Sequence, residues 1–116
     1  MKSLLSQIQI MTDKIVVFST AASADEAGRI ARALVNERLA ACVNVIPAIR
    51  SIYRWHGKIE DSEEVLLIIK SSRERFDALR VSLEKLHSYE VPEVIAVPVV
   101  DGARNYLHWM DGELGA

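Results

Sequence analysis

Short runs of β-branched, aliphatic and aromatic residues predict four strands, each bounded by polar or turn-forming residues. Pro47 interrupts the second and longest run, and Pro98 stands inside the last one. Because proline has no N–H to donate to a ladder, the last strand is expected at a sheet edge or a bulge. The predicted strands span residues 14–20, 42–55, 58–70 and 94–100.

Apolar residues three and four positions apart predict helices between and after these strands. The first helix follows Ser23-Ala-Asp-Glu26, which has the pattern of a capping box, and is expected to end near Ala41. A similar box, Ser71-Ser-Arg-Glu74, is expected to open the second helix. A short third helix is predicted over residues 105–110. The inner faces of the first two helices carry Ala27, Ile30, Ala31, Leu34 and Val35, and Phe76, Leu79, Leu83 and Leu86.

The predicted order is β-α-β-β-α-β followed by a closing helix, which is the ferredoxin-like split βαβ pattern of the α+β class. A chain of 116 residues has room for one such domain, which is expected over residues 14–116. Residues 1–13 are expected to form an N-terminal extension outside the fold, with Met11 as a plausible second start. They contain no uninterrupted apolar segment of the kind found in signal peptides.

The two central strands predict a long hairpin around a two-residue turn at His56-Gly57. Each arm has about 13 residues, or roughly 40 Å at about 3.3 Å per residue, whereas a 100-residue domain has a radius of gyration of only about 13 Å. The hairpin tip is therefore expected to project beyond its own subunit. The alternative is a bent hairpin that folds back on its own helices.

Two aromatic residues, Tyr53 and Trp55, share one face of this hairpin and would form an exposed apolar patch in a monomer. We therefore expect them at a subunit interface, with sheet extension between subunits in a closed cyclic ring. With a two-residue turn, the expected cross-strand pairs are Tyr53 with Glu60, Arg50 with Glu63, and Trp55 with Lys58.

The composition excludes several functional classes. With 14 basic and 16 acidic residues, the formal net charge is −2, which is not the footprint of a nucleic-acid binder. Apolar runs are too short to span a bilayer, so no membrane partner is expected. A single cysteine cannot form an internal disulfide, which favours a reducing, cytoplasmic location. The chain carries no nucleophile–base motif or glycine-rich phosphate loop, so no enzymatic activity is expected.

The candidate chemistry lies mainly in the segment His87-Ser-Tyr-Glu-Val-Pro-Glu93, which places an imidazole, a phenol and two carboxylates in one loop. His87 is either a metal ligand or a residue that caps the preceding helix. Cys42 is either a soft metal ligand or a buried packing residue. Lys70 either reaches solvent or holds an anion in a cleft lined by Tyr89, Glu90 and a neighbouring hairpin.

Five segments resemble the divalent-cation tolerance family known as CutA. They are Leu39-Ala-Ala-Cys-Val-Asn44, Ser51-Ile-Tyr-Arg-Trp-His-Gly-Lys58, Lys70, His87-Ser-Tyr-Glu-Val-Pro-Glu93 and Tyr106-Leu-His-Trp109.

The resemblance implies a cytoplasmic, non-enzymatic homotrimer of ferredoxin-like subunits whose long hairpins wrap their neighbours. It also implies a role in tolerance of copper(II) or another divalent cation, with His87 and Cys42 as the metal ligands. A likeness between such trimers and nitrogen-regulatory PII proteins suggests an alternative, a signalling or adaptor trimer with a small anionic ligand between its subunits.

This chain departs from the family pattern at three positions. Ser88 stands where the family often has proline, and Ser19 and Leu86 stand where some bacterial members have a cysteine and a second histidine. The two possible metal ligands at positions 19 and 86 are therefore missing here.

Overall fold

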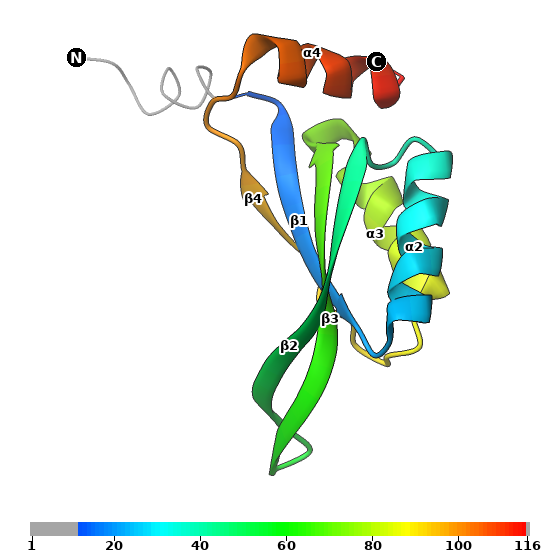
Figure 1. The fold of residues 1–116 in the computed structure, drawn as a ribbon, viewed down its shortest axis with the longest axis vertical. Coiled ribbons are helices and arrows are strands. Elements are labelled where there is room, and N and C mark those ends of the chain that lie inside the picture. Colours follow the sequence, from blue (N-terminus) through cyan, green and yellow to red (C-terminus); the bar gives the residue numbers. More distant parts are fainter. Residues whose placement is uncertain (1–11, 116) are drawn as a thin grey trace, which may run out of the picture.

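A four-stranded antiparallel sheet forms the centre of the computed structural model, which describes residues 12–115. The strands lie in the order β2-β3-β1-β4, and the elements follow along the chain in the predicted order, so the α+β class is confirmed. Three α-helices and one 3-10 turn complete the fold (Figure 1). The elements are β1 Lys14–Ala21, α2 Ala24–Asn36, β2 Cys42–Trp55, β3 Lys58–Ser72, the turn Arg73–Arg75, α3 Phe76–Leu86, β4 Ile95–Pro98 and α4 Arg104–Glu113.

Helices α2 and α3 pack on one face of the sheet and enclose the main core (Figure 1). Alternate side chains of the central strands point into it, and Val17, Leu67 and Ile69 are fully buried. Burial of each large aliphatic side chain contributes about 1.5–3 kcal/mol. The helices supply Ile30 and Leu34 from α2, and Leu79 and Leu83 from α3. The helix faces predicted from apolar spacing are therefore the buried ones, although Val35 and Leu86 at their ends are exposed.

Helix α4 lies at one end of the opposite face of the sheet (Figure 1). Met110 and Leu114 of α4 form a small second core with Ala41. Further along this face, β4 leaves Ile95 and Val97 55% and 43% exposed. An apolar sheet face thus remains accessible in the single chain.

The β2–β3 hairpin extends well beyond the rest of the subunit, away from both helices (Figure 1). Its turn has positive φ at His56 (50°) and Gly57 (78°), as a type I′ turn requires. The cross-strand pairs predicted for Tyr53, Trp55 and Arg50 are all present. The hairpin therefore projects as predicted and does not fold back on its own helices.

Proline interrupts two strands in the way the sequence predicts. The β2–β3 register shifts between Ile46 and Ile49, around Pro47 and Ala48, and Ala48 has a φ of 63°. Pro98 lies in β4, which is an edge strand. Both prolines thus sit where the loss of a ladder hydrogen bond is tolerated.

Two predicted helix boundaries were wrong. Helix α2 ends at Asn36 rather than near Ala41, because Arg38 turns the backbone at a φ of 60° and the Leu39 N–H donates to the Leu34 carbonyl. The second capping box does not form, because Ser71 belongs to β3 and its hydroxyl donates to the Leu39 carbonyl at 2.7 Å. A 3-10 turn connects the strand to α3 instead.

Most of the predicted N-terminal extension, residues 1–13, lies outside the described residues. Of the two residues of this segment that are described, Thr12 donates a hydrogen bond from Oγ1 to the Val99 carbonyl at 2.7 Å. No helix in the described part of the chain is long and apolar enough to cross a membrane.

Candidate functional site

His87 stands at the C-terminal end of α3, and its side chain is completely buried. The Tyr89 N–H donates to its Nδ1 at 3.0 Å, so the neutral ring carries its proton on Nε2. Nε2 lies 2.6 Å from the Thr20 carbonyl oxygen and donates to it. Both ring nitrogens are therefore occupied by backbone groups of this chain. A metal ion could bind His87 only if the ring gave up one of these contacts.

Glu26 organises the same loop from the other side. Its Oε2 accepts the Ser88 N–H at 2.8 Å, and its Oε1 accepts the Ala22 N–H at 3.2 Å. Burial by itself would raise the pKa of Glu26, but these hydrogen bonds and the neighbouring His87 outweigh it, so the pKa lies below its ordinary value. The Ser23 hydroxyl caps α2 by accepting the Glu26 N–H. Glu26 thus remains ionised and joins the start of α2 to the loop after α3.

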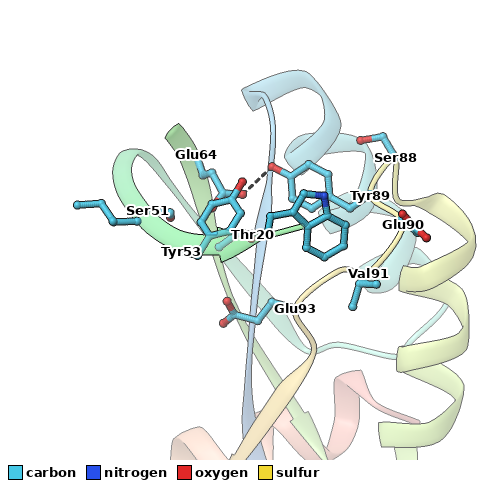
Figure 2. A pocket seen from close by; sticks show the side chains of 11 residues that line it. Thr20, Ser51, Tyr53, Glu64, Ser88, Tyr89, Glu90, Val91 and Glu93 are labelled. Carbon is cyan, nitrogen blue, oxygen red and sulfur yellow. Dashed lines mark hydrogen bonds between the residues drawn. The ribbon is translucent and has the colours of Figure 1, made fainter. Parts of the chain in front are cut away.

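Tyr89 connects this loop to the hairpin. Its hydroxyl donates to Glu64 Oε2 at 2.6 Å, and Glu64 is only 6% exposed (Figure 2). Burial and the Glu64 carboxylate both raise the pKa of Tyr89 well above its ordinary value. The phenol therefore stays protonated and acts as a donor.

A cavity of about 700 Å³ lies between the hairpin and the loop (Figure 2). Three carboxylates and three aromatic rings line it, and none of the described residues around it is basic. The lining therefore gives no support to the anionic ligand of the PII-like alternative. The carboxylates belong to Glu64, Glu90 and Glu93, and the rings to Tyr53, Trp55 and Tyr89.

Lys70 and Cys42 occupy a different place, on the sheet face opposite α2 and α3. They are cross-strand partners, and Lys70 Nζ lies 3.9 Å from Cys42 Sγ and also donates to Asn44 Oδ1. Lys70 pairs with Val16, four residues along β1 from Thr20 at the cavity, or about 13 Å at 3.3 Å per residue. Within one chain, Lys70 therefore does not share a cleft with Tyr89 and Glu90.

The residues described for one chain do not assemble a preformed metal site. No group of three or more His, Cys, Asp or Glu side chains with suitable geometry occurs among residues 12–115. His87 is held by backbone groups, and Cys42 has the Lys70 ammonium and the Tyr106 side chain as neighbours. Ser19 is buried, and its hydroxyl lacks a partner in the part of the chain that the structure describes.

Sequence reasoning identified the loop but missed the two carboxylates that hold it. Glu26 was predicted only as part of a capping box, and Glu64 was given no role in the loop. The contacts of Glu26 with Ser88 and of Glu64 with Tyr89 join segments far apart in the chain, so local spacing carries no signal for them.

Comparison with known proteins gives the family. A family model described as "CutA1 divalent ion tolerance protein" matches residues 15–113. The chain belongs to the CutA1 family. It is 45% identical over 100 residues to the divalent-cation tolerance protein CutA of Thermus thermophilus, covering 86% of this chain and 97% of that protein. It is also 52% identical over 93 residues to mouse protein CutA, of which it spans only about half, or 52%.

Solved structures of the family have the same fold. That of the periplasmic divalent cation tolerance protein CutA from Archaeoglobus fulgidus matches with a TM-score of 0.85 at 39% identity, covering 87% of this chain and 98% of that one. Because this relative is described as periplasmic, the cytoplasmic location of our chain stays a prediction. Family membership relates the chain to tolerance of divalent cations and names no enzymatic activity.

Proposed function

We propose that the protein is a non-enzymatic homotrimer of ferredoxin-like subunits that acts in tolerance of divalent cations, with copper(II) as the expected ion. The observation that carries the assembly is the projecting hairpin. Ile52 and Ile59 near its tip are 63% and 61% exposed, and Tyr53 and Trp55 are 43% and 40% exposed. Such an apolar ribbon, together with the accessible sheet face, is typical of surfaces that a subunit interface covers.

In this proposal, the metal contact is built between subunits. One chain supplies too few convergent ligands among its described residues, and His87 is already committed to backbone contacts. Cys42 is the soft ligand of the chain and is only partly buried, so we assign the copper contact to Cys42 rather than to His87. A symmetric trimer would bring three copies of each ligand into one assembly.

Sedimentation equilibrium tests the assembly. We expect a mass three times 13.0 kDa for the wild-type chain. The double variant Tyr53→Ser/Trp55→Ser is expected to dissociate into monomers at protein concentrations at which the wild type remains assembled. Arg54→Ser, on the opposite hairpin face, serves as the matched control. A monomer at micromolar concentration in the wild type would refute the trimer.

Calorimetric titration tests the metal role. Copper(II) and the redox-inert zinc(II) are titrated into the wild type, Cys42→Ser and His87→Ala. Saturable binding that weakens at least about tenfold, or 1.4 kcal/mol, in Cys42→Ser supports the assignment. Loss in His87→Ala with binding retained in Cys42→Ser would move the contact to His87. Absence of binding in the wild type would make the family's cation role indirect in this protein.

A further inference from the structure

Asp101 and Gly102 lie in the loop that joins β4 to α4 (Figure 1). The Gly102 N–H donates to Asp101 Oδ1 at 2.8 Å, so the aspartate side chain folds back on the peptide that follows it. Residues 99–103 belong to no helix or strand, and both residues of the pair are exposed. The loop thus holds a backbone nitrogen beside the carboxyl group of the preceding residue.

These two groups can react with each other, because they are already close and in one chain. The Gly102 nitrogen attacks the Asp101 carboxyl carbon, and the amide proton and the carboxyl OH leave as water, which gives a cyclic imide. Water then opens one of the two imide carbonyls. Opening at the side-chain carbonyl restores aspartate, whereas opening at the main-chain carbonyl gives isoaspartate. The net change is an isomerisation that consumes no oxidant, metal or other co-reactant.

The packing of the loop keeps glycine at the position that this reaction favours. A Cβ added to Gly102 would lie 3.1 Å from Leu107 Cδ2 and 3.3 Å from its Cγ. Leu107 packs against the small core of Met110 and Leu114, so a larger residue at position 102 would push on this core. Glycine also leaves its own nitrogen open to close approach by the carboxyl carbon.

A second Asp-Gly pair, Asp111-Gly112, gives an internal comparison. Both of its residues lie inside α4, where the helix fixes the backbone dihedrals and pairs each interior N–H with a carbonyl four residues back. Asp111 Oδ1 contacts Lys14 Nζ, which directs its carboxylate toward β1. Asp101 takes part in none of the ion pairs found between residues 12 and 115. The same dipeptide thus occurs once in a reactive and once in a protected setting.

Isoaspartate at position 101 would lengthen the main chain by one carbon–carbon bond, about 1.5 Å. The loop is anchored on both sides of this point. The Val99 N–H donates to the Lys14 carbonyl at 3.0 Å, and the Leu107 N–H donates to the Ala103 carbonyl at 3.0 Å in the first turn of α4. Because only residues 100–102 connect the two anchors, the added length displaces the start of α4 relative to the sheet.

We propose that Asp101 is a site of spontaneous isoaspartate formation, that α4 protects Asp111 from the same reaction, and that the modification loosens α4 from the sheet. The reaction is intramolecular and needs only water, so it depends neither on a bound metal nor on the number of subunits.

Peptide mapping of the full-length chain, in the assembly that it forms, tests the site. The protein is incubated in heavy-oxygen water at neutral pH and physiological temperature and digested at intervals, and electron-transfer fragmentation distinguishes aspartate from isoaspartate. We expect isoaspartate carrying one heavy oxygen to appear at position 101 at least about tenfold faster than at position 111. In the urea-unfolded chain the two rates should become similar, because the loop and the helix are then lost.

Asp101→Glu is the matched control, since it keeps the carboxylate but would have to close a larger ring, and it should not isomerise at this position. Equal rates at positions 101 and 111 in the folded protein would overturn the proposed site. So would no isoaspartate at position 101 over a time in which the unfolded chain reacts.

Hydrogen exchange tests the effect on α4, after ion-exchange chromatography separates the isomerised fraction from the unmodified one. We expect faster exchange of the α4 amides in the isomerised fraction, unchanged exchange in α2, and no change in Asp101→Glu incubated for the same time. Unchanged exchange in α4 of the isomerised fraction would overturn the proposed loosening.

Discussion

Glu26 and Ser88 are 62 residues apart in the chain, yet the Glu26 carboxylate accepts the Ser88 N–H at 2.8 Å. The same side chain accepts the Ala22 N–H near the start of α2 and lies 3.9 Å from His87. One nearly buried carboxylate therefore fixes both the beginning of the first helix and the loop after the second. The position of Tyr89, and with it one wall of the cavity, depends on this arrangement.

Replacement of Glu26 by glutamine keeps the shape and removes the charge. We expect Glu26→Gln to lower the free energy of unfolding by about 1–3 kcal/mol, since hydrogen bonds to charged groups are the stronger ones. Urea denaturation at neutral pH measures this change. Asp25→Asn, an exposed neighbour in the first turn of α2, is the control and is expected to change the free energy by less.

The same variant has a predictable dependence on pH. The pKa of Glu26 is lower in the folded state than in the unfolded state. The contribution of its carboxylate to the free energy of unfolding is therefore complete above the unfolded-state pKa and is lost as pH falls through the folded-state pKa. The difference in unfolding free energy between wild type and Glu26→Gln should therefore shrink in acid. A difference that stays constant down to low pH would contradict this assignment.

The stabilising contribution of Lys14 is expected to change with pH in the opposite direction, and to be lost at high pH. Its side chain is 4% exposed, and Nζ lies 2.5 Å from Asp13 Oδ1 and from Asp111 Oδ1 in α4. Burial alone would lower the pKa of Lys14, but the hydrogen bonds and charges of Asp111 and Asp13 raise it overall. The contribution of Lys14 to the free energy of unfolding is complete below its pKa in the unfolded state and is lost as pH rises through its pKa in the folded state.

We therefore expect Asp111→Asn to lower the free energy of unfolding by roughly 1–2 kcal/mol at neutral pH. The variant removes the charge that pairs with the buried Lys14 ammonium and so weakens the contact between α4 and β1. Asp13→Asn, whose carboxylate is more exposed, is the matched comparison and should cost less. Thermal unfolding at neutral and alkaline pH measures both. Equal effects of the two variants would mean that the contact of Lys14 with Asp111 in α4 stabilises the fold no more than its contact with Asp13.

Two glycines should respond to alanine with opposite sign. Gly57 has a φ of 78° in the hairpin turn, and no atom lies within 4 Å of an added Cβ, so the cost of Gly57→Ala is purely conformational, about 1–2 kcal/mol. Gly28 lies inside α2 with similar open space, so Gly28→Ala should stabilise the protein by about 0.5–1 kcal/mol. Denaturant midpoints measured on both variants check the contrast.

How well the sequence predicted each feature depends on how far apart in the chain its interacting residues lie. The strands, the hairpin register and the turn at His56-Gly57 depend on alternation and on residues adjacent in the chain, and they were predicted correctly. The end of α2 was not, because the left-handed backbone at Arg38 is set by the packing of the following segment rather than by a glycine.

The sequence singled out the loop from His87 to Glu93, and the role of this loop as a functional site stays a prediction. The residue types of the loop from His87 to Glu93 indicated chemistry, and the cavity does lie beside it. What each side chain does depends on contacts with Thr20, Glu26 and Glu64, which come from other elements. The sequence had left His87 open between metal ligand and structural residue, and the backbone contacts of both its nitrogens are what a structural role requires.

Tyr89→Phe isolates the contact that joins the loop to the hairpin. Removal of the hydroxyl leaves the nearly buried Glu64 without its donor, so we expect a loss of about 1–3 kcal/mol in unfolding free energy. Because the pKa of Tyr89 is raised, its folded state resists ionisation, and the stability it contributes falls once pH exceeds the ordinary tyrosine pKa. An absorbance titration of the phenolate should accordingly lose a late-ionising tyrosine in this variant.

The double variant Tyr89→Phe/Glu64→Gln should recover part of the lost stability, since it removes the unpaired charge along with its donor. If the double variant is no more stable than Tyr89→Phe alone, the hydroxyl and the carboxylate do not act as a pair.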